Sequence, residues 1–339
     1  MEVVRNQAKD AVVDSDPRII TKTSDDQVFP LTWYAVMWAR KLTKIPIKHT
    51  VVGRDLVFYR DEQGGVHCLE AYCAHRAADL SLGHCQNGAL HCAYHGWEFN
   101  GDGKCVKIPA HPDRPIPDFA HIKAYPVQEK AGLIWIYPQD ASLTHPEELT
   151  VFTELLDNNY SLSPYETTWK AHLTRVVESV LDVAHLPFVH KKTIGRRVDA
   201  EIRTLDFEVS DHNHIKIQNG GGMLEYSFPQ QWMLRPSVKS DRSFINYVTF
   251  TPISSTETMI FGYAGRTFLR SVPLMNKFFS YYSLKILEED RKVVESQHPR
   301  PIPEALRMEA HVPADGAQVR FRQRWYQFMT SNEAKVRTY

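Results

Sequence analysis

The sequence predicts an α+β fold in two domains, an all-β domain followed by one in which strands are combined with a long helix. Three observations predict it. Extended runs separated by turn residues occupy 51–71 and 124–137, as in antiparallel hairpins. Further extended runs between residues 202 and 264 precede a helical pattern at 274–297. The length of 339 residues suits two domains.

Two hairpins are expected in the first domain. The extended run 51–60 leads into the glycine-containing turn 61–65 and returns as 66–71. Later, the runs 124–128 and 133–137 flank a Lys-Ala-Gly turn. Because glycine adopts the backbone conformations that tight turns need, both segments are interpreted as antiparallel strand pairs.

The domain boundaries are predicted from composition. Residues 1–28 are mostly polar and are expected to form a flexible N-terminal extension. The polar segment 138–150 contains a proline and is expected to link the two domains. The first domain is therefore predicted to span residues 29–145, and the second to span residues 146–339.

The second domain is expected to mix helices and strands. A helix is predicted over residues 169–186, because Val176, Val177, Val180 and Leu181 recur at helical spacing and Pro187 follows. Two more helices are predicted at 274–297 and 318–329. Strands are predicted at 202–209, 215–218, 223–228, 244–250 and 258–264.

The first domain carries a distinctive set of sulfur and nitrogen ligands. Cys73-Ala-His75 and Cys92-Ala-Tyr-His95 each contain one cysteine and one histidine. Two thiolates and two imidazoles are the ligands of a Rieske-type [2Fe-2S] cluster, so Cys73, His75, Cys92 and His95 are the predicted cluster ligands. A structural zinc site is the alternative, although zinc fingers usually place like ligands in the same half of the motif.

A second metal-binding pattern lies in the predicted helix of the second domain. Glu178, Asp182 and His185 are spaced i, i+4 and i+7 and would share one helical face. His190 follows after the proline and is expected to return to the same point. Two imidazoles and one carboxylate form the facial triad by which non-haem Fe(II) activates O2.

Residues 178–190 resemble the iron motif of Rieske non-haem iron oxygenase large (alpha) subunits, and the upstream cluster motif is similar to theirs as well. The resemblance implies that His185 and His190 bind the mononuclear iron. It also implies that Asp182 is the carboxylate that connects this iron to a cluster histidine of a neighbouring subunit. The matching cluster histidine in this sequence is His95.

Asp290 occupies the position that matches the third iron ligand of the family. It is expected to point inward, because it shares a helical stripe with Ser283, Ile286 and Val293. Glu288 and Glu289 would then lie on other faces of the helix. In the alternative interpretation, Asp290 belongs to a surface charge pattern with the basic residues that follow it.

The resemblance also implies an architecture and an assembly. The first domain would be an all-β Rieske domain, and the catalytic domain would wrap a curved antiparallel sheet on its long helix. A homotrimer would place each cluster beside the iron of a neighbouring chain. One departure from the family pattern is Ser179, because many relatives carry asparagine there.

The expected function is that of a terminal oxygenase. The sequence has no glycine-rich dinucleotide fingerprint, so a separate NAD(P)H-dependent reductase, with or without a ferredoxin, is expected to supply the electrons. The resemblance favours hydroxylation of a small apolar aromatic or heterocyclic substrate, with demethylation where the oxidised carbon is an O- or N-methyl group. Ring cis-dihydroxylation is the second candidate reaction. A Rieske electron carrier without catalytic iron is the alternative from another class.

Aromatic and methionine side chains on the predicted strands offer one more hypothesis. They would provide a sheet face for a flat apolar ligand, although alternating aromatic residues in strands are more often core residues. The residues concerned are Phe228, Trp232, Met233, Phe244, Tyr247, Phe250, Met259, Phe261 and Tyr263.

Composition excludes several functional classes. Forty basic and forty acidic residues balance, which argues against nucleic acid or an anionic membrane as a partner. No apolar run long enough for a membrane span and no signal peptide is apparent, so a cytoplasmic location is expected. Cys68, Cys85 and Cys105 are expected to remain reduced thiols, and a disulfide among them is the alternative.

Overall fold

The structure is a computed structural model that describes residues 29–336 apart from 144, 202–205, 212, 220–221, 237–241 and 303–307. The predicted flexible extension over residues 1–28 therefore lies outside the described residues. Among the described residues, no helix has both the length and the apolar character that a membrane span requires.

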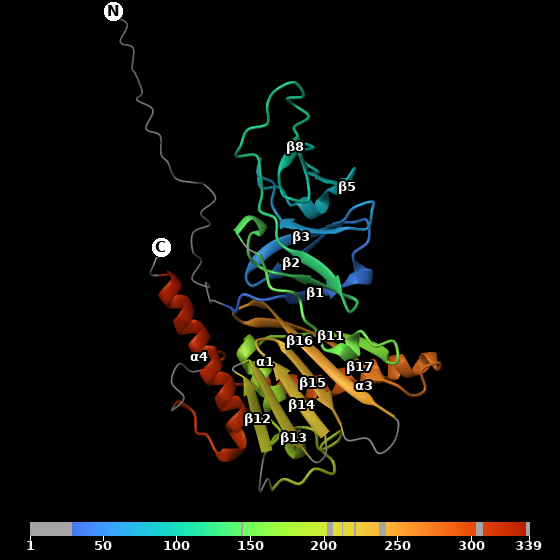
Figure 1. Ribbon diagram of the computed structural model, residues 1–339, viewed down its shortest axis with the longest axis vertical. Coiled ribbons are helices and arrows are strands. Elements are labelled where there is room, and N and C mark those ends of the chain that lie inside the picture. The colour runs from blue at the N-terminus through green and yellow to red at the C-terminus, as the bar shows by residue number, and fades with distance from the viewer. Residues whose placement is uncertain are drawn as a thin grey trace, which may run out of the picture.

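The first domain is built from three small antiparallel sheets, as predicted for an all-β module (Figure 1). The first sheet contains, in order, β1 (Tyr34–Trp38), β10 (Leu133–Ile136) and β9 (Val127–Lys130). The second contains β2 (Ile47–Val51), β3 (Arg54–Arg60) and β4 (Val66–Glu70). The third, farthest from the second domain, contains β5 (His84–Gln86), β6 (Ala89–His91), β7 (Glu98–Phe99) and β8 (Cys105–Lys107).

Both predicted hairpins are present, with one correction. Strands β3 and β4 pair across the turn 61–65, and β9 pairs with β10 across Ala131 and Gly132. The predicted run 51–60 is not a single strand, however, because Val52 and Gly53 form a turn between β2 and β3 with φ angles of 47° and 75°. A valine seldom adopts a positive φ, so this turn carried little signal in the sequence.

The second domain contains a seven-stranded antiparallel sheet. Its strand order is β11-β17-β16-β15-β14-β13-β12. Five of these strands were predicted within a few residues of their ends: β12 (Asp206–Asp211), β13 (His214–Asn219), β14 (Gly222–Ser227), β16 (Phe244–Ser254) and β17 (Glu257–Arg266). The sequence prediction missed β11 (Ser161–Trp169) and β15 (Gln231–Arg235). β11 contains Pro164, which is compatible with its place at the edge of the sheet.

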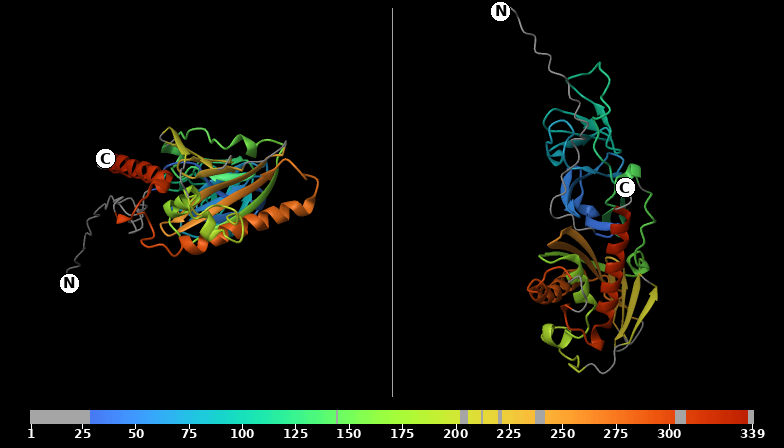
Figure 2. Two further views of the ribbon diagram at one scale, coloured as in Figure 1. Left: turned by 90° about the horizontal axis from the view of Figure 1, so that it is seen from below. Right: turned by 90° about the vertical axis from the view of Figure 1, so that its left-hand side faces the viewer.

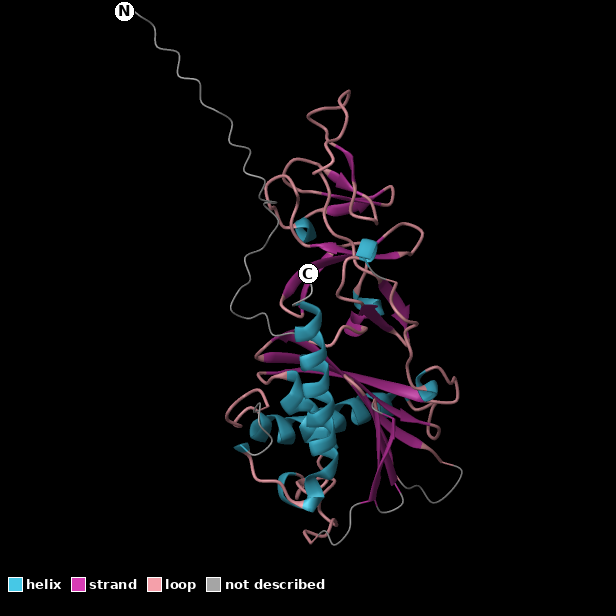
Figure 3. Ribbon diagram, turned by 60° about the vertical axis from the view of Figure 1, so that its left-hand side comes forward, coloured by secondary structure: helices cyan, strands magenta, loops and turns pink. Residues whose placement is uncertain are grey.

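In the part of the second domain that the structure describes, four α-helices gather on one side of the sheet (Figure 3). The long helix α3 (Pro273–Val294) packs along β11 and β17, close to the bounds predicted for it. α1 (Leu173–Leu181) packs on β16 and β17, and α2 (Leu186–Val189) lies against α3. α4 (Gly316–Val336) packs on α1 and runs along the outside of this layer toward the first domain (Figure 2). This combination of a β domain with a sheet-and-helix domain confirms the predicted α+β class.

The sheet is buried on both faces at β15, β16 and β17, which overturns the hypothesis of a single ligand-binding aromatic face. Trp232 and Phe250 belong to the core shared with the helices. Tyr247 and Phe261 belong instead to a core shared with the first domain, where Trp38 meets Phe261 edge to face at 5.5 Å. Because successive side chains of a strand point to opposite faces, the aromatic residues divide between two cores.

Hydrogen bonds tie the two domains together along this second core. The side-chain amide of Gln230 donates to the carbonyl of Trp33, and the Thr251 hydroxyl donates to the carbonyl of Ala35 at 2.5 Å. The Val52 N–H donates to the Pro252 carbonyl at 2.8 Å. The first domain is therefore docked on the sheet by its first strand and by the turn between β2 and β3.

Helix α1 begins four residues later than predicted. Trp169, the predicted start, is the last residue of β11, and His172 caps the helix. The Thr174 N–H and hydroxyl both donate to His172 Nδ1, at 3.2 and 2.7 Å. Since this nitrogen accepts both bonds, the cap requires a neutral imidazole. Burial first, and then the nearby Arg175 charge, lower the pKa of His172 to about 4.

We expect this cap to make stability pH-dependent. The pKa of His172 is lower in the folded state than in the unfolded state, so the unfolded chain binds more protons between the two values and stability falls as pH falls from about 6.5 toward 4. The loss between pH 7 and 5.5 should be about 1 kcal/mol. Urea unfolding of the wild type and of His172→Asn, which keeps a capping side chain without a titrating group, measures it. An equal pH dependence in both proteins would contradict the assignment.

Candidate functional site

Two loops of the first domain carry the predicted cluster ligands. In the first loop, the Cys73 N–H donates to the Ala78 carbonyl at 2.9 Å. The Ala77 N–H donates back to the Cys73 carbonyl at 2.8 Å, and Ala77 has a φ of 51°. The loop is thereby closed around the cysteine by two main-chain hydrogen bonds.

The second loop repeats this geometry. The Cys92 N–H donates to the Trp97 carbonyl at 2.8 Å, and the Gly96 N–H donates to the Cys92 carbonyl at 3.0 Å. Gly96 has a φ of 69°, in the left-handed region that Ala77 occupies in the first loop. The same backbone design thus presents one cysteine and one histidine from each loop, although the two histidines follow their cysteines at different spacings.

The four side chains meet between the loops. Cys73 and Cys92 are buried, while the rings of His75 and His95 lie 4.5 Å apart between centroids. Trp97 stacks on His75 at 4.7 Å with an interplanar angle of 2°. The buried Nδ1 of His75 has no hydrogen-bond partner among the described residues. A buried polar atom without a partner is costly, so this nitrogen is suited to a metal.

The electrostatics of the cysteines also fit a metal cluster. Burial and the adjacent Cys92 thiol raise the pKa of Cys73 to about 12, although main-chain N–H groups of His75 and Arg76 act to lower that pKa. The Cys73 thiol would therefore stay protonated without a cation, whereas a bound metal deprotonates thiols outright. The donor set, the N–H groups directed at sulfur and the unpartnered imidazole nitrogen all fit a [2Fe-2S] cluster.

The second group of predicted ligands lies where α1 gives way to α2. The predicted continuous helix over 169–186 is wrong, because Asp182 leaves the helix with a ψ of 129°. Its Oδ1 accepts a hydrogen bond from the Ala184 N–H at 2.7 Å, which competes with the helical pattern. Pro187 lies in the first turn of the separate helix α2, where proline is tolerated. Glu178, Asp182 and His185 consequently do not share one helical face.

His185, His190 and Asp290 nevertheless come together. Their potential ligand atoms all lie within 4.8 Å of one another. Asp290 Oδ1 is 2.9 Å from His190 Nε2 and 3.3 Å from His185 Nε2, and the two Nε2 atoms are 3.2 Å apart. His190 is 1% exposed and Asp290 is 8% exposed. Two imidazoles and one carboxylate at this spacing fit the facial triad of a mononuclear Fe(II) site.

The charges of this site favour a cation. Burial lowers the pKa of His185, but Asp182 and Asp290 outweigh it and raise the pKa to about 9. Burial raises the pKa of Asp290, but the two histidines outweigh it and lower the pKa below its usual value. The raised pKa of His185 favours a proton on that imidazole, and a divalent metal can replace the proton.

Glu289 is a site residue that the sequence prediction missed. Glu289 was expected on another face of the helix, yet the His190 ring donates from Nδ1 to Glu289 Oε2 at 2.9 Å. The Thr193 hydroxyl donates to the same oxygen at 2.6 Å. His190 lies across α3, so its Nε2 faces Asp290 while its Nδ1 faces the adjacent residue. A carboxylate on the second ring nitrogen fixes the tautomer and orientation of a metal-binding histidine.

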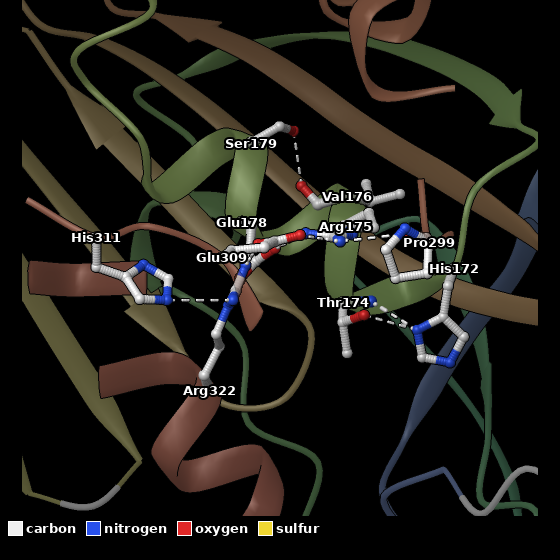
Figure 4. Close-up of polar contacts among 10 residues, drawn as sticks. All are labelled: His172, Thr174, Arg175, Val176, Glu178, Ser179, Pro299, Glu309, His311 and Arg322. Carbon is white, nitrogen blue, oxygen red and sulfur yellow. Dashed lines mark hydrogen bonds and ion pairs between the residues drawn. The ribbon is translucent and has the colours of Figure 1, made fainter. Parts of the chain in front are cut away.

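Glu178 lies away from this triad. Its carboxylate is bound by Arg175, with Nη1 to Oε2 at 3.0 Å, and by Arg322 of α4 (Figure 4). A cavity of about 240 Å³ lies between these groups and the triad, and its lining includes Asp182, His185 and Asp290. Asp182 is 31% exposed, with its Oδ2 3.6 Å from His185 Nδ1.

Comparisons with known proteins agree with both candidate centres. The family model of the Rieske [2Fe-2S] domain matches residues 32–126, and that of the vanillate O-demethylase oxygenase C-terminal domain matches residues 222–330. The first match lies inside the predicted first domain, and the second lies inside the predicted catalytic domain. The exact boundaries after residues 28 and 145 stay predictions.

Individual relatives extend this similarity. The chain is 29% identical over 289 residues to the chloroplastic protein TIC 55 of Arabidopsis thaliana, an alignment that covers 78% of this chain and 53% of that protein. It is 33% identical over 168 residues to the vanillate O-demethylase oxygenase subunit of a Pseudomonas strain. That alignment covers 49% of this chain and 46% of that protein. The solved structure of NdmA from Pseudomonas putida CBB5 superposes with a TM-score of 0.77 at 25% identity, covering 86% of this chain and 88% of that chain.

The order of domains, with a two-loop cysteine and histidine module before a sheet-and-helix domain, is the order in which the two family models match the chain. The chain contains a Rieske [2Fe-2S] domain followed by a vanillate O-demethylase-type C-terminal domain, and its homologues are alpha subunits of Rieske non-haem iron oxygenases. The chain spans about half the length of the curated relatives it matches, 53% and 46% in the two cases above.

We expect Glu289→Gln to weaken iron binding about 10- to 100-fold, because the amide removes the carboxylate partner of the His190 ring. The measurement is mononuclear iron retained against a graded series of chelator concentrations, with the cluster absorbance as an internal standard. Glu288→Gln is the matched control, since Glu288 is the adjacent residue and pairs with Arg291. Equal iron retention in the two variants would show that Glu289 does not orient His190.

Proposed function

We propose that the chain is the terminal oxygenase of a multicomponent system. One observation carries the proposal: His185, His190 and Asp290 converge in the same chain that carries the two Rieske loops. An electron carrier needs only the cluster. A second metal site in the same chain can accept electrons from a cluster and use them in a reaction. His185, His190 and Asp290 would hold the iron, and Cys73, His75, Cys92 and His95 would hold the cluster. 

When bound, the cluster supplies single electrons, and the iron supplies the activation of O2 for insertion of one oxygen atom into a C–H bond. The chain's own part is to position the reacting groups. Asp290 and Glu289 hold His190 from its two ring nitrogens, while Asp182 faces His185 from the side away from Asp290. The histidines are therefore fixed in orientation before substrate arrives.

The arrangement of the two sites supports a homotrimer in which centres pair between chains. Both cluster cysteines pack with β6 and β7, in the part of the first domain farthest from the second domain (Figure 1). Helix α1 packs on the face of the seven-stranded sheet opposite the one that contacts the first domain. Transfer within one chain would cross both domains. We propose instead that Asp182 accepts a hydrogen bond from His95 of a neighbouring copy, which is the role that the family resemblance assigns to it.

The electron donor and the substrate are further parts of the proposal. A separate NAD(P)H-dependent reductase, with or without a ferredoxin, would reduce the cluster. The substrate would be a small apolar aromatic or heterocyclic molecule, and oxidation at an O- or N-methyl group would lead to demethylation. The names of two relatives, a vanillate O-demethylase and a dicamba O-demethylase, support this class. The cytoplasmic location stays a prediction.

The proposal is tested by iron content and by product. We expect about three iron atoms per chain, two in the cluster and one in the triad. With a surrogate reductase, a screen of methoxy-aromatic, N-methyl and polycyclic compounds should find one that stimulates O2 uptake and gains one oxygen atom or loses one CH2. Two iron atoms per chain and no substrate-stimulated uptake would support the electron carrier. Two added hydroxyl groups would instead identify a dihydroxylase.

Replacing Asp182 tests the connection between centres. We expect Asp182→Ala to keep both metals and to lower turnover by a factor of about 100 or more. The reason is that loss or displacement of the group that connects the two centres slows electron transfer between them. Iron content and steady-state product formation are the measurements. Asp157→Ala is the matched control, since Asp157 makes the same kind of turn by accepting from the Asn159 N–H. Normal turnover in a fully metallated Asp182→Ala protein would refute the connection.

A further inference from the structure

Two arginines and two glutamates form a largely buried cluster (Figure 4). They line the same cavity as His185 and Asp290. Glu178 accepts from Arg175 Nη1 at 3.0 Å and from Arg322 Nε. Glu309 accepts from the remaining ends of the same guanidinium groups, from Arg175 Nη2 at 2.7 Å and from Arg322 Nη2 at 2.6 Å. Opposite charges thus alternate around a closed ring, which compensates their removal from water.

The ring joins segments that are far apart in the sequence. Arg175 and Glu178 belong to α1, Arg322 belongs to α4, and Glu309 belongs to the segment before α4. Arg175 Nη2 also donates to the Pro299 carbonyl at 3.0 Å, just beyond the end of α3. The side chains of Arg175, Glu178 and Arg322 are less than 10% exposed. The last turn of α1 is therefore held from two other elements.

Glu178 also makes the backbone contact that leads into the iron site. Its carbonyl accepts a hydrogen bond from the Asp182 N–H at 3.1 Å, the last helical bond before the chain turns toward His185. Glu178 and Asp182 are thus the first and last residues of the final hydrogen-bonded turn of α1, so the position of Glu178 affects the position of Asp182. A shift of this turn would move the Asp182 carboxylate along the edge of the cavity.

We propose that Glu178 is a positioning residue for electron transfer between chains. Through the two arginines it fixes the final turn of α1, and so it fixes where Asp182 presents its carboxylate to the neighbouring cluster. This inference rests on the proposed function of Asp182. Misplacement of a reacting group by about 1 Å can lower a rate about a hundredfold, so a modest shift of this turn has a measurable effect.

Glu178→Gln is the direct test, because it keeps the side-chain size and removes the charge that both arginines share. The reduced protein is mixed with substrate and O2, and oxidation of the cluster is followed by its visible absorbance. We expect transfer to slow about tenfold or more at unchanged iron content. Amide exchange over residues 179–184 should also become faster. Glu154→Gln is the matched control, since Glu154 pairs with Arg235 at 2.6 Å in another two-glutamate cluster of the second domain.

Combination with Asp182→Ala separates positioning from a general loss of structure. If Glu178 acts through Asp182, the Glu178→Gln/Asp182→Ala protein should transfer electrons no more slowly than Asp182→Ala alone. Losses that multiply in the double variant would overturn the inference, because they would reveal independent effects. A transfer rate of Glu178→Gln equal to that of Glu154→Gln would overturn it as well.

The outcomes also distinguish this inference from the proposed function. If Asp182→Ala transfers electrons at the wild-type rate, the connection between centres fails and the role of Glu178 fails with it. If Asp182→Ala blocks transfer while Glu178→Gln leaves it unchanged, the connection stands and the positioning role alone is overturned. Should Glu178→Gln fail to fold, Arg322→Lys keeps the charge but loses the two-pronged contact. It is expected to slow transfer at unchanged iron content, and unaltered transfer there would overturn the inference.

Discussion

The burial of strands β15, β16 and β17 on both faces of the sheet is the constraint on which the rest of the structure depends. Phe250 packs toward the helices and Tyr247 toward the first domain, although both belong to β16. Because side chains alternate along a strand, the same strands carry the helix layer and the domain junction. A shift of register by one residue would exchange the two cores, so the sheet fixes the positions of both candidate centres together.

The helix layer contains two clusters of charged side chains, one around Glu178 and one around Asp290. They differ in how the charges are compensated after removal from water. The ring around Glu178 is closed within the chain, since every carboxylate oxygen faces a guanidinium group. The triad around Asp290 leaves two imidazoles directed at one another and at a single oxygen. The first arrangement pairs all four carboxylate oxygens without a ligand, whereas the second is improved by a cation that replaces protons. This contrast separates a structural cluster from a metal site.

The parts of the site that were predictable from sequence are those encoded locally. The cluster loops combine short ligand spacings with a turn at Gly96, and the structure brings those ligands together. The helix over 169–186 was overextended, because its apolar period does not reveal that Asp182 bonds to the Ala184 backbone. Glu289 was missed for a different reason. Which of two adjacent helical residues meets a histidine depends on how that histidine crosses the helix, and this is set by tertiary packing.

Exposure provides the last argument for pairing of centres between chains. Within one chain, a group that exchanges electrons internally can be buried completely, whereas a group that serves another chain must stay accessible until the chains meet. His95 is exposed in the single chain, and the adjacent Tyr94 is 66% exposed. Asp182 is likewise 31% exposed, although its neighbours His190 and Asp290 are almost fully buried. The two groups proposed to meet are thus the accessible members of otherwise buried sites.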